Sequence, residues 1–239
     1  RCALNLAGPG ITKDAIRHGE MVLAPALHAP TMRIDAEVTL LPGEKALTMW
    51  QPVRLHHAAA EIGARIVLLG DETAPGADGL IQLVLDEPLA AAVLDRFVLR
   101  DASATRTIGG GRFLDLRAPE RRRRSPERLA QLAALSNFDP ADALQALLAV
   151  PPYHADLDGF VRDRALGPGA AENLSNRLDL VRIGPLALLP AHWQVLAQAA
   201  TERLDAFHAE HPDLPGMGLE RLRFAVAPRW PAPLFRQAL

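Results

Sequence analysis

Cysteine and lysine are almost missing from this chain of 239 residues, and long apolar runs are absent. The single cysteine, Cys2, excludes an internal disulfide and a cysteine-ligated zinc site. The two lysines, Lys13 and Lys45, do not follow a glycine, which excludes a phosphate-binding P-loop. No apolar run reaches the roughly 18 residues that are needed to cross a membrane. Because the chain opens with Arg1 and has no signal-peptide pattern, we expect a piece of a longer cytoplasmic protein with no membrane partner.

Motifs for catalysis are also lacking. No Gly-x-Ser-x-Gly nucleophile elbow occurs, and Gly109-Gly110-Gly111 lacks the strand-then-helix context of a dinucleotide fingerprint. These glycines are more typical of a kink or bulge in a strand. His208 and His211 have the spacing of a ligand pair on a helix, but no third ligand accompanies them. We expect no catalytic residue, no metal site and no cofactor in this chain.

The charge of the chain is close to balanced, because 26 basic side chains face 28 acidic ones. Overall basicity therefore does not indicate a nucleic-acid partner, and any basic surface must be local. Apolar residues make up 49% of the chain, as in ordinary folded domains. The length suits two domains and part of a third.

Residues 31–117 have the pattern of β structure. Short runs of β-branched and aliphatic residues recur, and several alternate between charged and apolar positions, as in Arg33 to Val38. Turn sequences at 42–43, 70–71 and 75–76 separate the runs. The runs are residues 33–41, 53–57, 64–69, 80–85, 97–100 and 106–116. Six strands at this spacing predict a compact barrel or sandwich.

The period changes to that of helices near residue 125. Ser125 suits a helix N-cap and Pro126 the first helical position, and leucines follow on one face. Further helices are expected from residue 139, at 157–165 and at 170–178, and a hairpin at 181–189. Three short helices followed by a hairpin predict a winged helix. A long helix at 192–210 and a shorter one at 219–226 would begin a second such unit.

Residues 117–128 join the two halves and contain six arginines together with prolines. One interpretation is a solvated linker. The other is a contact with phosphate, because four adjacent guanidiniums, at Arg121, Arg122, Arg123 and Arg124, repel one another unless anions lie nearby. Both interpretations stay open at this point.

Several stretches resemble translation factors. Residues 1–8 and 11–24 are similar to the end of the second domain of translational GTPases, with His18-Gly19 in place of the common Arg-Gly. More selective are Trp50-Gln-Pro-Val-Arg-Leu-His-His-Ala-Ala59, Asp95-Arg-Phe-Val-Leu-Arg-Asp101 and Arg106-Thr-Ile-Gly-Gly-Gly-Arg112. They resemble the third domain of the selenocysteine-specific elongation factors, which also carry winged helices after it. The resemblance covers nearly the full chain and is densest over residues 1–135.

The resemblance implies a multidomain protein, β then α, in which a translation-factor β-barrel of the domain III type precedes winged-helix domains. Residues 1–28 would be the remnant of domain II, 29–117 the barrel, and 118–135 an Arg-rich linker with a helix. Residues 136–190 would form the first winged helix, and 191–239 the truncated start of the second. The GTPase domain of the family, with its GTP and Mg²⁺, would lie outside this piece, so we expect no enzyme activity.

The resemblance also implies where RNA would bind. Arg1 takes the position of a basic contact to the selenocysteyl group, for which a guanidinium is a permanent partner. The third domain of this superfamily packs on tRNA stems, through phosphates and 2′-hydroxyls. The candidate contacts are Arg54, His56, His57, Arg100, Asp101, Thr105, Arg106, Arg121, Arg122, Arg123 and Arg124. Whichever of the two histidines faces inward is expected to form a hydrogen bond in the barrel instead.

The implied function is a part of the factor that delivers selenocysteyl-tRNA to the ribosome at recoded UGA codons. We expect a monomeric piece that binds tRNA and acts as a spacer, without chemistry of its own. The messenger hairpin would be bound only by later winged helices that this chain lacks. Glu172 and Asp179 dilute the positive charge of Arg177 and Arg182 around helix 170–178, and this mixed charge favours a spacer. The alternative is a winged-helix DNA-binding regulator fused to a β-domain.

Overall fold

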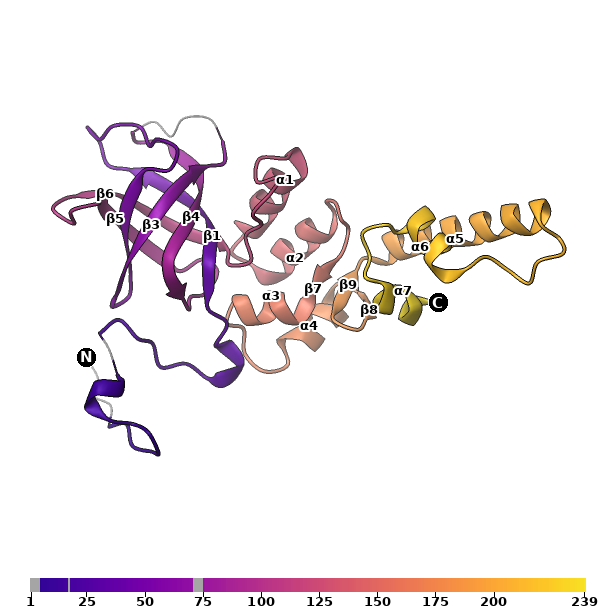
Figure 1. Ribbon diagram of the computed structural model, residues 1–239, viewed down its shortest axis with the longest axis horizontal. Helices are drawn as coiled ribbons and strands as arrows, with labels where there is room; N and C mark the ends of the chain where they lie inside the picture. Colours follow the sequence, from indigo (N-terminus) through magenta and orange to yellow (C-terminus); the bar gives the residue numbers. More distant parts are fainter. Residues whose placement is uncertain (1–4, 17, 71–74) are drawn as a thin grey trace. The chain divides into compact units, whose positions relative to one another are not determined.

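The computed structural model describes residues 5–16, 18–70 and 75–239 (Figure 1). Contacts divide the chain into two units, Arg1–Arg124 and Ser125–Leu239. Within the described ranges, no helix combines the length and the apolar character that crossing a membrane requires. The β-then-α order that the sequence predicts is confirmed.

The first unit is a closed antiparallel barrel with strand order β1-β4-β3-β2-β5-β6. Alternate side chains point inward, so that Ile34, Ala36 and Val38 are fully buried while Arg33 and Glu37 lie on the outer face. Closure pairs every strand on both sides and leaves no open edge. The strands are β1 (Thr31–Leu40), β2 (Pro52–His57), β3 (Ala60–Leu68), β4 (Asp78–Leu89), β5 (Arg96–Asp101) and β6 (Thr107–Asp115). All six match the apolar runs of the sequence.

The glycine triplet Gly109–Gly111 lies inside β6, where this strand closes the barrel against β1. A Cβ atom on Gly111 would lie 1.8 Å from the carbonyl oxygen of Glu37, so only glycine permits this approach of the two strands. The triplet therefore belongs to a strand, as expected, and does not form a nucleotide-binding loop.

The segment before the barrel has little regular structure. It contains the short 3₁₀ turns η1 (Lys13–Ala15) and η2 (Pro25–Leu27). The similarity of residues 11–24 to the end of the second domain of translational GTPases would place a strand at the end of that stretch. The structure has none among the described residues of this segment. A strand requires a hydrogen-bonded neighbour, and the six barrel strands already pair with one another.

The second unit begins with α1 (Pro126–Leu135) and α2 (Pro140–Leu148), which have the predicted caps. The Ser125 hydroxyl accepts from the Arg128 amide, and Asp139 accepts from two amides of the first turn of α2. A three-stranded sheet of order β7-β9-β8 and two further helices complete the fold. These elements are β7 (Ala155–Asp156), α3 (Leu157–Asp163), α4 (Ala170–Arg177), β8 (Val181–Ile183) and β9 (Leu186–Leu188).

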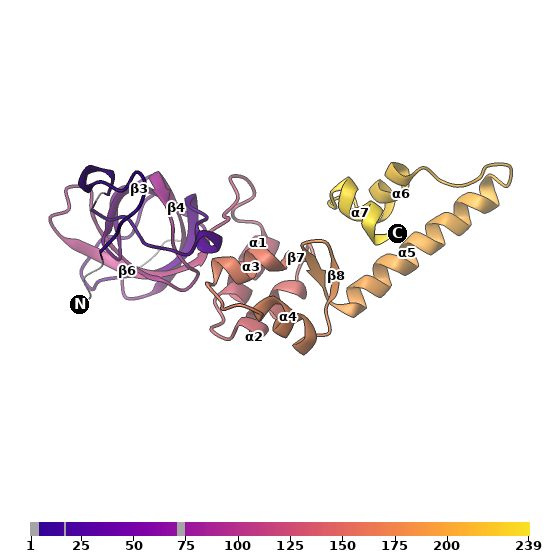
Figure 2. The ribbon, with the colours of Figure 1, turned by 90° about the horizontal axis from the view of Figure 1, so that it is seen from below.

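Three more helices follow: α5 (Pro190–Glu210), α6 (Leu219–Val226) and α7 (Ala232–Ala238). Figure 2 shows α6 and α7, in yellow, beside α5 and close to the β8–β9 hairpin. Hairpin residues Ile183 and Leu188 share one core with Leu222, Trp230 and Phe235. The hairpin that would be a wing is therefore packed against the helices that follow it. The sequence predicted α5 and α6 but not α7.

Candidate nucleic-acid interface

The outer face of β2 and β5 brings two candidate arginines together. Arg54 on β2 lies directly opposite Arg100 on β5 in the antiparallel register. Arg54 is exposed and Arg100 is half-buried, with an Nε atom that has no hydrogen-bond partner in the described part of the chain. Two like charges in a directly opposed pair destabilise a sheet. An anion between the two guanidiniums would remove that repulsion.

A carboxylate lies close to this pair. Gly63 of β3 is opposite Arg54 in the register, and Asp86 extends over this glycine from β4. A Cβ atom on Gly63 would lie 2.1 Å from Asp86 Oδ2 and 3.7 Å from Arg54 Nη1. The glycine thus leaves the space that the Asp86 side chain occupies. Besides Asp86, the face carries Glu61, which lies opposite His56 in the register of β2 and β3.

His56 and His57 separate as the alternation of a strand requires. His57 is 5% exposed and its ring contacts Phe113, at 5.3 Å between centroids. Its Nε2 donates to Asp95 Oδ2 over 2.9 Å. His57 is therefore removed from the RNA candidates, because its side chain lies in the barrel core. It is the inward-facing histidine that the sequence predicted to form a hydrogen bond there.

Asp95, the hydrogen-bond partner of His57, has a lowered pKa. Burial alone would raise the pKa of Asp95, but hydrogen bonds from His57 and from the Ala92 amide, with the charge of His57, lower it below its ordinary value. The carboxylate therefore ties β2 to the turn before β5. This contact supports the position of Arg54 and Arg100 from inside.

His56 lies on the outer face of the barrel and is half-buried. It lines a 460 Å³ pocket together with Arg96 and Arg112, and its Nε2 atom is buried without a hydrogen-bond partner within the described residues. Arg96 lies opposite Arg112 across β5 and β6, and Arg112 forms an ion pair with Glu37. Sequence reasoning missed Arg96. The alternation within β5 was the available signal, because it places Arg96 on the same face as Arg100.

The next three candidates, Asp101, Thr105 and Arg106, form contacts within or beside the turn between β5 and β6. Asp101 accepts hydrogen bonds from the Thr105 amide and hydroxyl, both at 2.7 Å, and from the Ser103 hydroxyl and the Arg106 amide. The hydrogen bond from the Thr105 side chain is the largest cause that holds the pKa of Asp101 well below its usual range. Arg106 forms an ion pair with Glu44 at 2.9 Å. Asp101, Thr105 and Arg106 are thus occupied in shaping and neutralising this turn.

The segment after β6 differs from the solvated linker that its composition suggests. Gln82 on the outer face of β4 donates to the Pro119 carbonyl at 3.0 Å, and both Gln82 and its neighbour Asp35 are fully buried beneath the segment. Glu120 forms an ion pair with Arg33 at 2.7 Å. Residues 118–124, named the arginine strap from here on, are therefore docked on the barrel.

In the part of the chain that the structure describes, the four strap arginines contact backbone carbonyls or solvent rather than carboxylates. Arg123 Nε donates to the Glu120 carbonyl and Arg124 Nε to the Leu68 carbonyl, each at 2.7 Å. Arg121 and Arg122 are exposed. Among the described residues, none of the four guanidiniums forms an ion pair with a carboxylate. The strap thus holds an uncompensated positive charge on the barrel surface.

In the first part of the second unit, two arginines lie beside carboxylates. Arg177, at the end of α4, lies 3.6 Å from Asp139 and 3.9 Å from Asp142. Arg182, in the hairpin, lies 3.3 Å from Asp158. Both cations that could contact nucleic acid are therefore compensated by carboxylates of the same domain.

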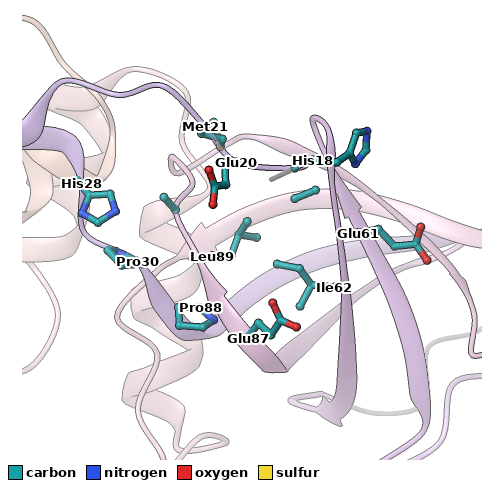
Figure 3. Close-up of a pocket in the computed structure, with 13 residues that line it drawn as sticks. His18, Glu20, Met21, His28, Pro30, Glu61, Ile62, Glu87, Pro88 and Leu89 are labelled. Carbon is teal, nitrogen blue, oxygen red and sulfur yellow. The ribbon is translucent and has the colours of Figure 1, made fainter. Parts of the chain in front are cut away.

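A further pocket of 510 Å³ lies between the segment before β1 and the rim of the barrel. Figure 3 shows Glu20, His18 and His28 on the segment side, and Glu61 and Glu87 on the strands. Its carboxylates make it unsuitable for a polyanion. No group of three or more potential metal ligands occurs in the described residues. Arg1, the candidate for the selenocysteyl pocket, lies outside them.

Comparison with known proteins supports the resemblance. The family model of the selenocysteine-specific elongation factor β-barrel domain matches residues 27–120, and that of the elongation factor SelB winged helix matches residues 201–239. A solved bacterial selenocysteine-specific elongation factor, EF-Sec, has the same fold over 90% of this chain and 33% of its own, with a TM-score of 0.62 and 16% identity.

Two curated relatives extend the match along the chain. The selenocysteine-specific elongation factor of Escherichia coli is 36% identical over 95% of this chain, and that of Haemophilus influenzae is 27% identical over 93%. The chain spans 35% of the length of each of these relatives. The matches do not favour a DNA-binding regulator. Their agreement over both the barrel and the helical unit shows that this chain belongs to the SelB family of selenocysteine-specific elongation factors.

Proposed function

We propose that this chain is a tRNA-binding and spacer part of a selenocysteine-specific elongation factor. In this proposal the outer face of β2 and β5 contacts the backbone of a tRNA stem, through Arg54, Arg100 and His56. The partner is selenocysteyl-tRNA, which the complete factor delivers to the ribosome in the cytoplasm. The chain itself contributes no chemistry and binds as a monomer.

The opposed pair of Arg54 and Arg100 is the observation that carries the proposal. No described carboxylate forms an ion pair with either guanidinium, and the two residues are held opposite each other by the strand register. Phosphates of an RNA backbone supply the missing negative charge in the form that arginine binds best. Contacts of this kind recognise the shape of an RNA helix rather than its sequence.

The spacer role rests on the compensated charges of the winged helix. Because Arg177 and Arg182 each lie beside an acidic side chain, α4 and the hairpin offer a polyanion little net attraction. The hairpin is also packed against the following helices. We therefore assign the first winged helix to separating the barrel from later parts of the factor, without binding the messenger hairpin.

Titration of labelled tRNA against the chain at several salt concentrations tests the proposal. Binding should be weak and should fall steeply with salt, because phosphate contacts release counterions. Replacing both residues, Arg54→Ala and Arg100→Ala, should weaken binding about tenfold or more and lower the salt slope by about one per lost phosphate contact. GTP hydrolysis should stay undetectable.

The matched control is Arg229→Ala with Arg236→Ala, which removes two exposed arginines from the second unit. This control should leave tRNA affinity almost unchanged. Equal losses in the two double variants would mean that only total charge matters, and the assigned face would be wrong.

A further inference from the structure

An exposed tryptophan stands beside the arginine strap. Trp50 lies two residues before the start of β2, and 49% of its surface is accessible to solvent. Arg123 of the strap is placed over its ring, with the guanidinium carbon 5.9 Å from the ring centroid. Large aromatic side chains are usually buried, so an exposed ring next to a run of arginines requires an explanation.

The backbone holds the Trp50 ring in this place. The Trp50 amide donates to the Ile66 carbonyl at 2.6 Å, and the Ile66 amide donates to the Gln51 carbonyl at 3.0 Å. The φ angle of Trp50 is 63°, in the left-handed region that a bulky side chain rarely adopts. The tryptophan is thus fixed to the end of β3 and does not turn into the core.

The contact with Arg123 leaves the ring available. At 5.9 Å the guanidinium is at the outer limit of a cation–π contact. Arg123 and Arg124 are anchored by their Nε atoms to carbonyl oxygens, which leaves their terminal nitrogens for another partner. Arg121 and Arg122 are exposed. The exposed ring of Trp50 thus lies against Arg123, and the neighbouring strap arginines form no ion pair with a carboxylate among the described residues.

We propose that Trp50 and the arginine strap bind an unpaired nucleotide of RNA. The base stacks on the Trp50 ring, and Arg121, Arg122 and Arg124 hold the flanking phosphates. Stacking of bases on aromatic side chains beside a basic groove is the general way in which proteins bind single strands. The proposal shares its class of partner with the proposed function, but it uses none of the residues of the β2–β5 face.

The competing explanation is that Arg123 packs on Trp50 only to dock the strap. In that case the ring would serve the fold, and its replacement by another apolar side chain would leave RNA binding unchanged. A binding platform instead requires an aromatic ring. The two explanations thus differ in what leucine and phenylalanine do at position 50.

The test titrates the full chain with a short single-stranded oligouridylate and with the same strand in a duplex, following tryptophan fluorescence and the anisotropy of labelled RNA. We expect the single strand to quench part of the fluorescence. Trp50→Leu should remove that part and weaken single-strand binding about tenfold, whereas Trp50→Phe should retain most of the affinity. Circular dichroism and the melting temperature show whether each variant is folded.

Charge is tested separately from stacking. Arg121→Ala with Arg122→Ala should weaken single-strand binding and lower its salt slope, while Arg229→Ala with Arg236→Ala, an equal change of charge, should not. Equal affinity of Trp50→Leu and the unchanged chain, or equal losses in the two double variants, would overturn the proposal.

The outcome is distinguishable from that of the proposed function. Arg54→Ala with Arg100→Ala should weaken binding of tRNA and leave oligouridylate binding intact. If tRNA does not bind while Trp50 still reports single-strand binding, the proposed function fails and this inference stands.

Discussion

Arginines lie on the outer face of both units, but their surroundings differ. On the barrel, Arg54 lies opposite Arg100 and neither forms an ion pair with a described carboxylate. In the second unit, Arg177 lies beside Asp139 and Asp142, and Arg182 beside Asp158. A guanidinium beside a carboxylate attracts a phosphate far less than one that is uncompensated, since the two charges largely cancel at the distance of a ligand. The local sign of charge, rather than the number of arginines, separates the two surfaces.

The position of Arg54 on the barrel depends on core contacts that hold β2 in place. His57→Ala should remove the hydrogen bond to Asp95 and the contact with Phe113, and we expect a loss of about 2–4 kcal/mol in the free energy of unfolding. Urea unfolding of the full chain measures this loss.

The matched control for that variant is the neighbouring outward histidine. His56→Ala should change the free energy of unfolding by no more than about 0.5 kcal/mol, while it weakens tRNA binding. If the two variants are equally stable, the separation of an inner and an outer histidine is contradicted.

The pH dependence of stability tests the same contact. Because the pKa of Asp95 is lowered from its ordinary value of 3.8, its ionised form is the one that the fold favours. Its stabilising contribution should be complete above the unfolded pKa and should be lost as pH falls through the lower folded value. Asp95→Asn should reduce the steepness of acid unfolding in this range, as followed by circular dichroism. If acid unfolding of Asp95→Asn follows the same pH dependence as that of the unchanged chain, the stabilising role of the ionised Asp95 is contradicted.

Removing Arg177 and Arg182, the compensated arginines of the second unit, tests the other side of the comparison. Arg177→Ala with Arg182→Ala should leave tRNA affinity within about twofold of the unchanged chain, because these charges already have partners. Stability should fall by only about 0.2–1 kcal/mol per pair, as for exposed ion pairs. A loss of affinity as large as that of the Arg54 and Arg100 double variant would show that both units bind RNA.

The smallest expected effect concerns Asp86, the carboxylate close to Arg54 on the barrel. Asp86→Asn removes one negative charge near Arg54, and we expect tRNA affinity to rise about twofold to threefold at low salt. The rise should disappear at high salt, where exposed charges are screened. Weaker binding by this variant would mean that Asp86 orients Arg54 rather than opposing the RNA.

Local patterns predicted most of the fold. The alternation from Arg33 onward indicated a strand because neighbouring side chains of a strand point to opposite faces. β1 has that pattern of burial except at Asp35, which the arginine strap covers. Ser125 and Asp139 cap helices where they were expected to, since a cap involves only the next few amides. The short helix α7 was missed, with Pro231 before it and Pro233 in its first turn.

The candidate site could be predicted less well. The sequence placed Arg54, Arg100 and the strap arginines among the RNA candidates, and it anticipated that one histidine would be internal. It did not show that Arg106 reaches Glu44, which is 62 residues away. The docking of the strap was also missed, because composition describes how polar a segment is and not which surface it meets.

The sequence by itself determined the class of the two units, the order of their elements and the family, because these depend on the period and the identity of nearby residues. Only the tertiary structure decided which arginines are compensated and which are not. The interaction between two charges depends on their distance in space and on the solvent between them. Arg177 and Asp139 are 38 positions apart in the chain and 3.6 Å apart in the fold.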